Sequence, residues 1–268
     1  MEHVKNDEIR SLVRENYGKV AEVDSAGCGC SPSTDCCTDT KATAEKVSVA
    51  LGYSKDDVTT IPEGANMGLG CGNPQAIALL QPGETVLDLG SGGGFDCFLA
   101  AKAVGEKGHV IGVDMTPEMI SKARKNAATA GVDHVEFRLG EIEKLPVADG
   151  QVDVIISNCV INLSPEKRDV FSDSFRVLKP GGRLAISDIV ATAKLPDSVR
   201  QDMVLLTGCM AGATSIHELE SMLGEAGFTE IRIKPKDESK EFIRDWAPGH
   251  KIEEYVVSAT IEAVKPEA

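Results

Sequence analysis

The stretch VLDLGSGGG, residues 86–94, decides the fold of this 268-residue chain. Its apolar first half is typical of a short buried strand, predicted over residues 85–89, and a helical segment that ends at Val104 follows it. Between the two lie Gly90, Gly92 and Gly94. Glycine is needed where a turn is tight and where a ligand approaches the backbone closely. The stretch therefore predicts a strand, a ligand-binding turn and a helix.

Two acidic residues indicate what kind of ligand this turn binds. Asp114 ends the next predicted strand, where a carboxylate can accept hydrogen bonds from ribose hydroxyls. The dinucleotide pattern G-x-G-x-x-G/A fails in both registers, because Phe95 or Cys97 stands where it needs glycine or alanine. Asp88, two residues before Gly90, suits a cationic ligand better than a pyrophosphate. We therefore expect a nucleoside ligand that carries positive charge.

The pattern on either side of this stretch alternates strands with helices. Further strands are predicted at residues 109–113, 135–139, 152–157 and 183–189. Helices are predicted at 117–130, from Ser164 to just before Pro180, and after the capping box SIHE at residues 215–218. Two more strands, 229–234 and 255–264, follow. Such alternation is typical of an α/β fold with a Rossmann-like, doubly wound and mostly parallel sheet.

The chain divides into three predicted parts. Residues 1–61 form an N-terminal helical cap, with helical periodicity at 7–23 and 41–51 around a cysteine-rich stretch. Residues 62–190 form the Rossmann-like domain. Residues 191–268 form a C-terminal extension that completes the sheet and the substrate site, with Trp246 packing this region onto the body.

Composition excludes several function classes. The chain carries 42 acidic and 28 basic residues, a net charge of −14, and no basic cluster, which argues against nucleic acid as a partner. Apolar runs fall short of the ~18–20 residues that a membrane span needs. The charged start MEHVKNDEIR is unlike a secretion signal, so we expect a cytoplasmic protein. In that reducing compartment, eight cysteines favour ligand, nucleophile or redox roles over disulfides.

Three cysteines follow or precede predicted strands at one end of the sheet. Cys71 lies in the glycine-rich loop GANMGLGCGNP, residues 64–74, Cys159 follows the strand 152–157, and Cys209 follows the fifth strand. Loops at the carboxyl ends of parallel strands surround the ligand crevice, so these thiols can converge on it. Their spacing differs from that of structural zinc sites. Burial as a small apolar residue is an equal alternative for Cys159 or Cys209 alone, and it is favoured for Cys97.

The remaining cysteines form close pairs before residue 40: Cys28, Cys30, Cys36 and Cys37. Three roles stay open for them. They can bind a soft metal, deliver an acceptor to the site, or shuttle disulfides.

The motif D-L-G-S-G-G-G resembles the D-x-G-x-G-x-G motif of class I S-adenosylmethionine-dependent methyltransferases, over residues 85–189. This resemblance implies S-adenosylmethionine as the cofactor, with Asp114 on its ribose and Glu141 and Ile142 at its adenine. It also implies an antiparallel last strand. The full set of implied cofactor-binding residues is Asp88, Gly90, Ser91, Gly92, Asp114, Met115, Glu141, Ile142 and Asn158.

A narrower resemblance covers residues 17–266. The segments GANMGLGCGNP, VGEKGHVIGVDMTPEM, SNCVINLSPEK, TGCMAGA and EYVVSATIEAVKP are together similar to the arsenite methyltransferase family. The resemblance implies that Cys71, Cys159 and Cys209 bind trivalent arsenic and that one N-terminal cysteine joins the thiol chemistry, without choosing among the four. It also implies successive methylation of arsenite and methylarsenite for detoxification, with thioredoxin or glutathione as the reductant.

The chemistry of arsenic suits these residues, because a soft trivalent centre prefers thiolates to oxygen or imidazole. Three sulfurs leave the arsenic lone pair free, and its displacement of a methyl group needs positioning more than proton transfer. Two alternatives remain. One is a methyltransferase for another small molecule, such as a quinone or a sterol, and the other is a non-catalytic thiol sensor of arsenic or metals.

Overall fold

The computed structural model describes residues 2–22, 40–200, 202–247 and 249–267. Its strands form one eight-stranded sheet of order β3-β2-β1-β4-β5-β8-β7, and β6 pairs with β5 beside this path. β1 to β5 are parallel, and β8 is antiparallel to both β5 and β7. The strands are β1 (Thr85–Leu89), β2 (His109–Asp114), β3 (Val135–Leu139), β4 (Val152–Asn158), β5 (Leu178–Ala191), β6 (Thr214–Ser215), β7 (Thr229–Lys236) and β8 (Val256–Val264).

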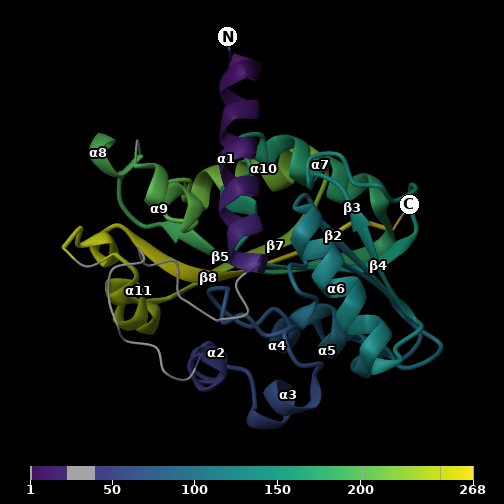
Figure 1. Cartoon of the computed structure of the whole chain (residues 1–268). Helices are drawn as coiled ribbons and strands as arrows, with labels where there is room; N and C mark the ends of the chain where they lie inside the picture. The colour runs from purple at the N-terminus through teal and green to yellow at the C-terminus, as the bar shows by residue number, and fades with distance from the viewer. Residues whose placement is uncertain (1, 23–39, 201, 248, 268) are drawn as a thin grey trace.

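Helices cover both faces of this sheet and its carboxyl-end edge (Figure 1). The α-helices are α1 (Glu2–Glu22), α2 (Thr40–Ala50), α3 (Lys55–Thr60), α4 (Gln75–Ala78), α5 (Phe95–Val104), α6 (Pro117–Ala130), α7 (Lys167–Val177), α8 (Asp197–Arg200), α9 (Met203–Thr207), α10 (Ile216–Ala226) and α11 (Lys240–Trp246). Short 3-10 turns are η1 (Ile161–Leu163), η2 (Asp237–Ser239) and η3 (Ile252–Glu254).

Two apolar cores lie on opposite faces of the sheet. Alternate residues of a strand point to opposite faces, so Val86 packs with α4, α5 and α6 while its neighbour Leu87 packs with α7 and α10. Both side chains are fully buried. Burial on both faces is what a parallel sheet covered by crossover helices requires.

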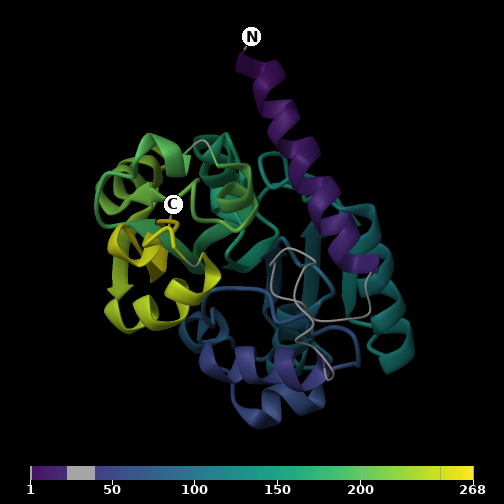
Figure 2. The ribbon, with the colours of Figure 1, turned by 60° about the vertical axis from the view of Figure 1, so that its left-hand side comes forward.

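A third apolar cluster lies at the carboxyl ends of the strands and includes Cys71, Cys159 and Cys209. α1 contributes Val13 to this cluster, and α11 contributes Ile243. The N-terminal helix, the central loops and the C-terminal region therefore meet at the same end of the sheet. Figures 1 and 2 both show that α1 lies across the molecule from α2 and α3.

The seven predicted strands are confirmed, with ends that agree within two residues except at the start of β5. β5 begins at Leu178 instead of residue 183, because Val152 of β4 pairs with Leu178 before the register shifts at the Pro-Gly-Gly segment. The antiparallel last strand is confirmed. α3, α4, α8, α9 and α11 were not predicted, since short helices carry little periodicity. The four cysteines before residue 40 lie outside the described residues.

The helices of the described ranges include none that is both long and apolar enough to cross a membrane.

The predicted capping box is present, and its contribution to the stability of the fold can be tested. The Ser215 hydroxyl accepts the backbone N–H of Glu218, and the Glu218 carboxylate accepts the Ser215 N–H. Ser215→Ala should lower the free energy of unfolding by about 1 kcal/mol, because one N–H of the first turn of α10 loses its partner. Thermal unfolding should then shift down by roughly 2–4 °C. Ser221→Ala, at an exposed position in the same helix, should leave the midpoint nearly unchanged, and equal shifts in both variants would contradict the role of the cap.

Candidate active site

The glycine-rich turn is built by backbone hydrogen bonds between β1 and β2. Gly90 and Ser91 donate their N–H groups to the Val113 carbonyl at 2.8 and 3.0 Å. Gly90 has φ 69°, and a Cβ there would lie 2.3 Å from Val160 Cγ2. Only glycine combines this conformation with this close approach. The turn is therefore held against the segment that carries Cys159.

Asp114 orders the same turn from the end of β2. Its carboxylate accepts the N–H of Gly92 at 3.0 Å and the N–H of Thr116 at 2.8 Å. Burial raises the pKa of Asp114, and these two N–H donors oppose that rise.

A cavity opens beside this turn, and most of the predicted cofactor residues line it. Asp88, Gly90, Ser91, Gly92, Asp114, Met115, Ile142 and Asn158 all contribute to its wall, and Cys159 lies on it too. Further lining residues were not predicted, among them Arg10, Tyr17, Asn66, Asp96 and Glu143. Glu141 is absent from the wall, and its carboxylate pairs with Arg14 at 3.2 Å.

Two buried carboxyl groups face this cavity from β1 and the first turn of α5. Tyr53 donates its hydroxyl to Asp96 at 2.8 Å, and the Cys97 thiol donates to Asp88 at 3.2 Å. Burial raises the pKa of both carboxyl groups. Two buried acidic groups without a cationic side chain among their described hydrogen-bond partners favour a positively charged ligand in the cavity. Cys97 itself is fully buried in the core, as predicted.

Ser91 supplies an independent sign of a ligand. Its hydroxyl oxygen is buried on the cavity wall and has no hydrogen-bond partner among the described residues. Buried polar atoms rarely remain without a partner, so this hydroxyl fits a polar ligand in the cavity. The glycine-rich turn, the acidic wall and this hydroxyl together suit a cationic nucleoside such as S-adenosylmethionine.

Cys71 is held at the end of β4 by its own backbone. Its N–H donates to the Asn158 side chain at 3.0 Å, and its carbonyl accepts the Ser258 hydroxyl at 2.7 Å. The Cys71 thiol donates to the Ser187 carbonyl at 3.6 Å. The loop from Gly64 to Pro74 is thereby fixed to β4, β5 and β8.

Cys159 and Cys209 share a strained backbone geometry. Their φ angles are 60° and 62°, a left-handed conformation that residues other than glycine seldom adopt. The Cys159 N–H donates to the Ser187 carbonyl at 2.8 Å, and the Cys209 thiol donates to the Cys159 carbonyl at 2.6 Å. Strain of this kind persists where the surrounding structure imposes it, and it concentrates at functional sites.

The three cysteines belong to one buried cluster, and the pKa of each thiol is raised. Burial raises the pKa of Cys71 to about 11. A hydrogen bond with the Cys159 thiol, together with burial, raises the pKa of Cys209 well above its usual value. The hydrogen bond with Cys209 lowers the pKa of Cys159. The hydrogen bond with Cys71 and burial raise it by more, so the pKa of Cys159 is also well above its usual value. Cys71, Cys159 and Cys209 thus share one buried cluster, although the group of ligand atoms within 4.8 Å of one another comprises Cys71, Cys159 and Asp188 and does not extend to Cys209.

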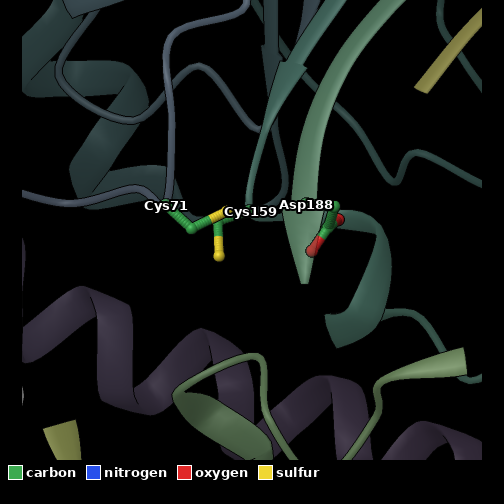
Figure 3. A group of neighbouring side chains, drawn as sticks. All are labelled: Cys71, Cys159 and Asp188. Carbon is green, nitrogen blue, oxygen red and sulfur yellow. The ribbon is translucent and has the colours of Figure 1, made fainter. Parts of the chain in front are cut away.

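Asp188, near the end of β5, is a neighbour that the sequence analysis did not identify. One carboxylate oxygen and the sulfurs of Cys71 and Cys159 all lie within 4.8 Å of one another (Figure 3). Burial raises the pKa of Asp188 to about 6, and N–H donors oppose that rise. The signal that could have found it is the one used for Asp114, an acidic residue near the carboxyl end of a parallel strand.

α1 closes the site from the other side. Tyr17 donates its hydroxyl to the Thr207 carbonyl at 3.1 Å, and Arg14 donates to the Met115 carbonyl at 3.2 Å. Arg10 pairs with Glu143 and Glu166. One helix therefore connects the end of β2 with the segment that leads to Cys209.

Comparison with known proteins agrees with this geometry. A family model described as a methyltransferase domain matches residues 80–227. The chain is 58% identical to an arsenite methyltransferase of Halobacterium salinarum over 97% of its own length and 67% of that protein's length. It is 34% identical to an arsenite methyltransferase of Mus musculus over 86% of its own length and 61% of the mouse protein.

A solved structure agrees as well. The arsenic(III) S-adenosylmethionine methyltransferase of Chlamydomonas reinhardtii superposes with a TM-score of 0.62 at 35% identity, covering 84% of this chain and 74% of that one. The chain thus spans about two thirds of the length of the curated relatives named above. These matches confirm the Rossmann-like methyltransferase fold and the S-adenosylmethionine cofactor that the sequence predicted. The chain belongs to the arsenite methyltransferase family of S-adenosylmethionine-dependent enzymes.

Proposed function

We propose that this protein transfers methyl groups from S-adenosylmethionine to trivalent arsenic held by Cys71, Cys159 and Cys209. The observation that carries the proposal is the position of Cys159, which belongs both to the thiol cluster and to the wall of the cofactor cavity. An arsenic atom on these thiols would be next to whatever the cavity holds. Arsenite is the first substrate, and methylarsenite follows as the second.

The three thiols bind arsenite without a change of charge. Each neutral thiol gives its proton to one hydroxyl of arsenous acid, so water leaves as each arsenic–sulfur bond forms. The raised pKa of Cys71 and burial of all three sulfurs suit this neutral exchange. Burial also excludes water from the arsenic once it is bound.

The cavity residues bind and orient the methyl donor. We assign Asp114 to the ribose hydroxyls, the glycine-rich turn with Ser91 to the polar end of the ligand, and Ile142 to the adenine. Glu141 would act on the adenine end through Arg14 and Arg10, with which it pairs. Asp88 and Asp96 supply negative charge, and Asn158 connects the cavity to the Cys71 loop. When bound, S-adenosylmethionine supplies a methyl group on a positively charged sulfur.

The family resemblance supports three finer proposals. One of Cys28, Cys30, Cys36 and Cys37 takes part in the thiol chemistry, thioredoxin or glutathione restores the reduced thiols, and the protein works in the cytoplasm. A second function, methylation of a quinone or sterol, lacks support from the site, because the thiol cluster would then have no role.

The direct test is incubation of the purified chain with arsenite, a thiol reductant and S-adenosylmethionine that carries a labelled methyl group. We expect label in methylated arsenic. Arsenite binding without transfer of label would favour a sensor, and transfer of label only to an organic acceptor would favour another methyltransferase.

The thiol assignment predicts the effect of single serine substitutions. Cys159→Ser or Cys209→Ser should abolish arsenite methylation, because a hydroxyl cannot replace a thiolate as a ligand of a soft centre. The dissociation constant of S-adenosylmethionine should stay close to the wild-type value. Cys97→Ala, which removes a buried thiol outside the cluster, should leave the affinity for arsenite unchanged. Full methylation activity in either serine variant would contradict the assignment of three thiolate ligands to the arsenic.

The ribose assignment predicts weaker cofactor binding in Asp114→Ala. Loss of hydrogen bonds to a charged group, worth about 1.5–3 kcal/mol, should raise the dissociation constant of S-adenosylmethionine by about 10–100-fold. Titration calorimetry measures this constant without turnover. Asp133→Ala, which removes an exposed carboxylate away from the cavity, should have a much smaller effect. An unchanged constant in Asp114→Ala would refute its role at the ribose.

A further inference from the structure

Asp188 has no part in the mechanism described so far, although it lies beside the thiols. Figure 3 shows its carboxyl group next to Cys71 and Cys159, and the three ligand atoms lie within 4.8 Å of one another. The residue is only 2% exposed. A buried carboxylate is costly unless it is paired or hydrogen-bonded.

The fold surrounds this carboxyl group with hydrogen-bond donors. Its Oδ2 accepts the N–H of Ile161 at 3.0 Å. Its Oδ1 accepts the Asn162 side-chain amide at 2.9 Å and the N–H of Ile189 at 2.7 Å. Three N–H donors on two oxygens favour the ionised form, because each donates to a lone pair of the carboxylate.

The charge is badly placed to help the thiols ionise. A carboxylate within 4.8 Å of the Cys71 and Cys159 sulfurs repels negative charge there and does not favour thiolates. Neutral arsenite needs no such help, since its binding exchanges three neutral thiols for a neutral arsenic complex. The charge of Asp188 suits a later species that carries positive charge.

Methyl transfer creates that species at the arsenic. The arsenic lone pair forms the As–C bond, the S–C bond of the donor breaks, and its electron pair stays on the donor sulfur. No proton moves. The positive charge passes from that sulfur to the arsenic, so a neutral complex with three sulfurs becomes a cation.

We propose that Asp188 is a fixed anion that stabilises positive charge on the arsenic bound by Cys71, Cys159 and Cys209 as the methyl group arrives. The inference rests on the proposed function. It makes Asp188 an electrostatic determinant of the transfer step, with little influence on how tightly the neutral substrate binds.

The placement of the other carboxylates supports this role. Asp88, Asp96 and Asp114 line the cofactor cavity, where their charge favours the donor before transfer. Asp188 is not part of that wall and lies on the thiol side, within 4.8 Å of two of the sulfurs. The positive charge of Lys167 lowers the pKa of both Asp188 and Cys209, and its ammonium group donates to the Ser164 carbonyl at 3.4 Å. Three carboxyl groups thus lie on the donor side and favour positive charge there, while Asp188 favours positive charge on the acceptor side.

The first test measures substrate binding without the methyl donor. Arsenite is titrated into Asp188→Asn by calorimetry, with Cys28, Cys30, Cys36 and Cys37 replaced by serine so that these four thiols cannot bind it. The affinity for arsenite should change little, because arsenous acid and three neutral thiols form a neutral complex.

The second test is single-turnover methylation of bound arsenite, with the native N-terminal cysteines. The transfer rate should fall about 100-fold in Asp188→Asn, the scale seen when one preorganised group that stabilises developing charge is removed. Asn162→Ala is the matched control, because it removes one of the three donors to Asp188 and keeps the charge. In this variant the transfer rate should fall much less than in Asp188→Asn.

A loss of arsenite affinity in Asp188→Asn as large as the loss of transfer rate would show that the residue only positions the Cys159 segment, and would overturn the inference. So would an unchanged transfer rate in Asp188→Asn. If the unaltered protein fails to methylate arsenite, the proposed function fails instead, and the two failures are thereby distinguished.

Discussion

The carbonyl oxygen of Ser187 organises the site, because two of the proposed arsenic ligands donate to it. The Cys159 N–H reaches this oxygen at 2.8 Å as the parallel pairing of β4 and β5 ends, and the Cys71 thiol reaches it at 3.6 Å. Gly72 lets the Cys71 loop approach, since a Cβ there would lie 2.9 Å from the Ser187 side chain. Because β4 and β5 are neighbours in the sheet, the loop after β4 and the loop that carries Cys71 both reach Ser187 of β5 and can bind the same substrate.

The cofactor cavity and the thiol cluster adjoin each other and form one proposed active site. Asn158 lines the cavity and holds the Cys71 backbone, while Cys159 belongs to both regions. The left-handed conformations of Cys159 and Cys209 are maintained by a buried environment that leaves them little freedom to relax. A rigid acceptor next to a bound donor is what an in-line transfer requires, because most of the rate gain comes from positioning.

Local patterns predicted the strands, the glycine-rich turn and the capping box at Ser215, because each depends on residues close in sequence. Topology predicted that Cys71, Cys159 and Cys209 would meet, since parallel strands place their carboxyl ends together. The contribution of α1 could not be predicted this way, because the docking of Tyr17 against the Thr207 carbonyl spans most of the chain. Asp188 was missed although its position near a strand end was visible. The role proposed for Asp188 depends on distances between side chains, which the spacing of residues along the sequence does not determine.

In the proposed site, three thiols from three loops hold the arsenic. X-ray absorption at the arsenic edge can count these ligands, on the protein with arsenite bound and with Cys28, Cys30, Cys36 and Cys37 replaced by serine. We expect a coordination shell of three sulfurs and no oxygen, which loses one sulfur in Cys209→Ser. Two sulfurs and an oxygen in the protein that keeps Cys71, Cys159 and Cys209 would contradict it.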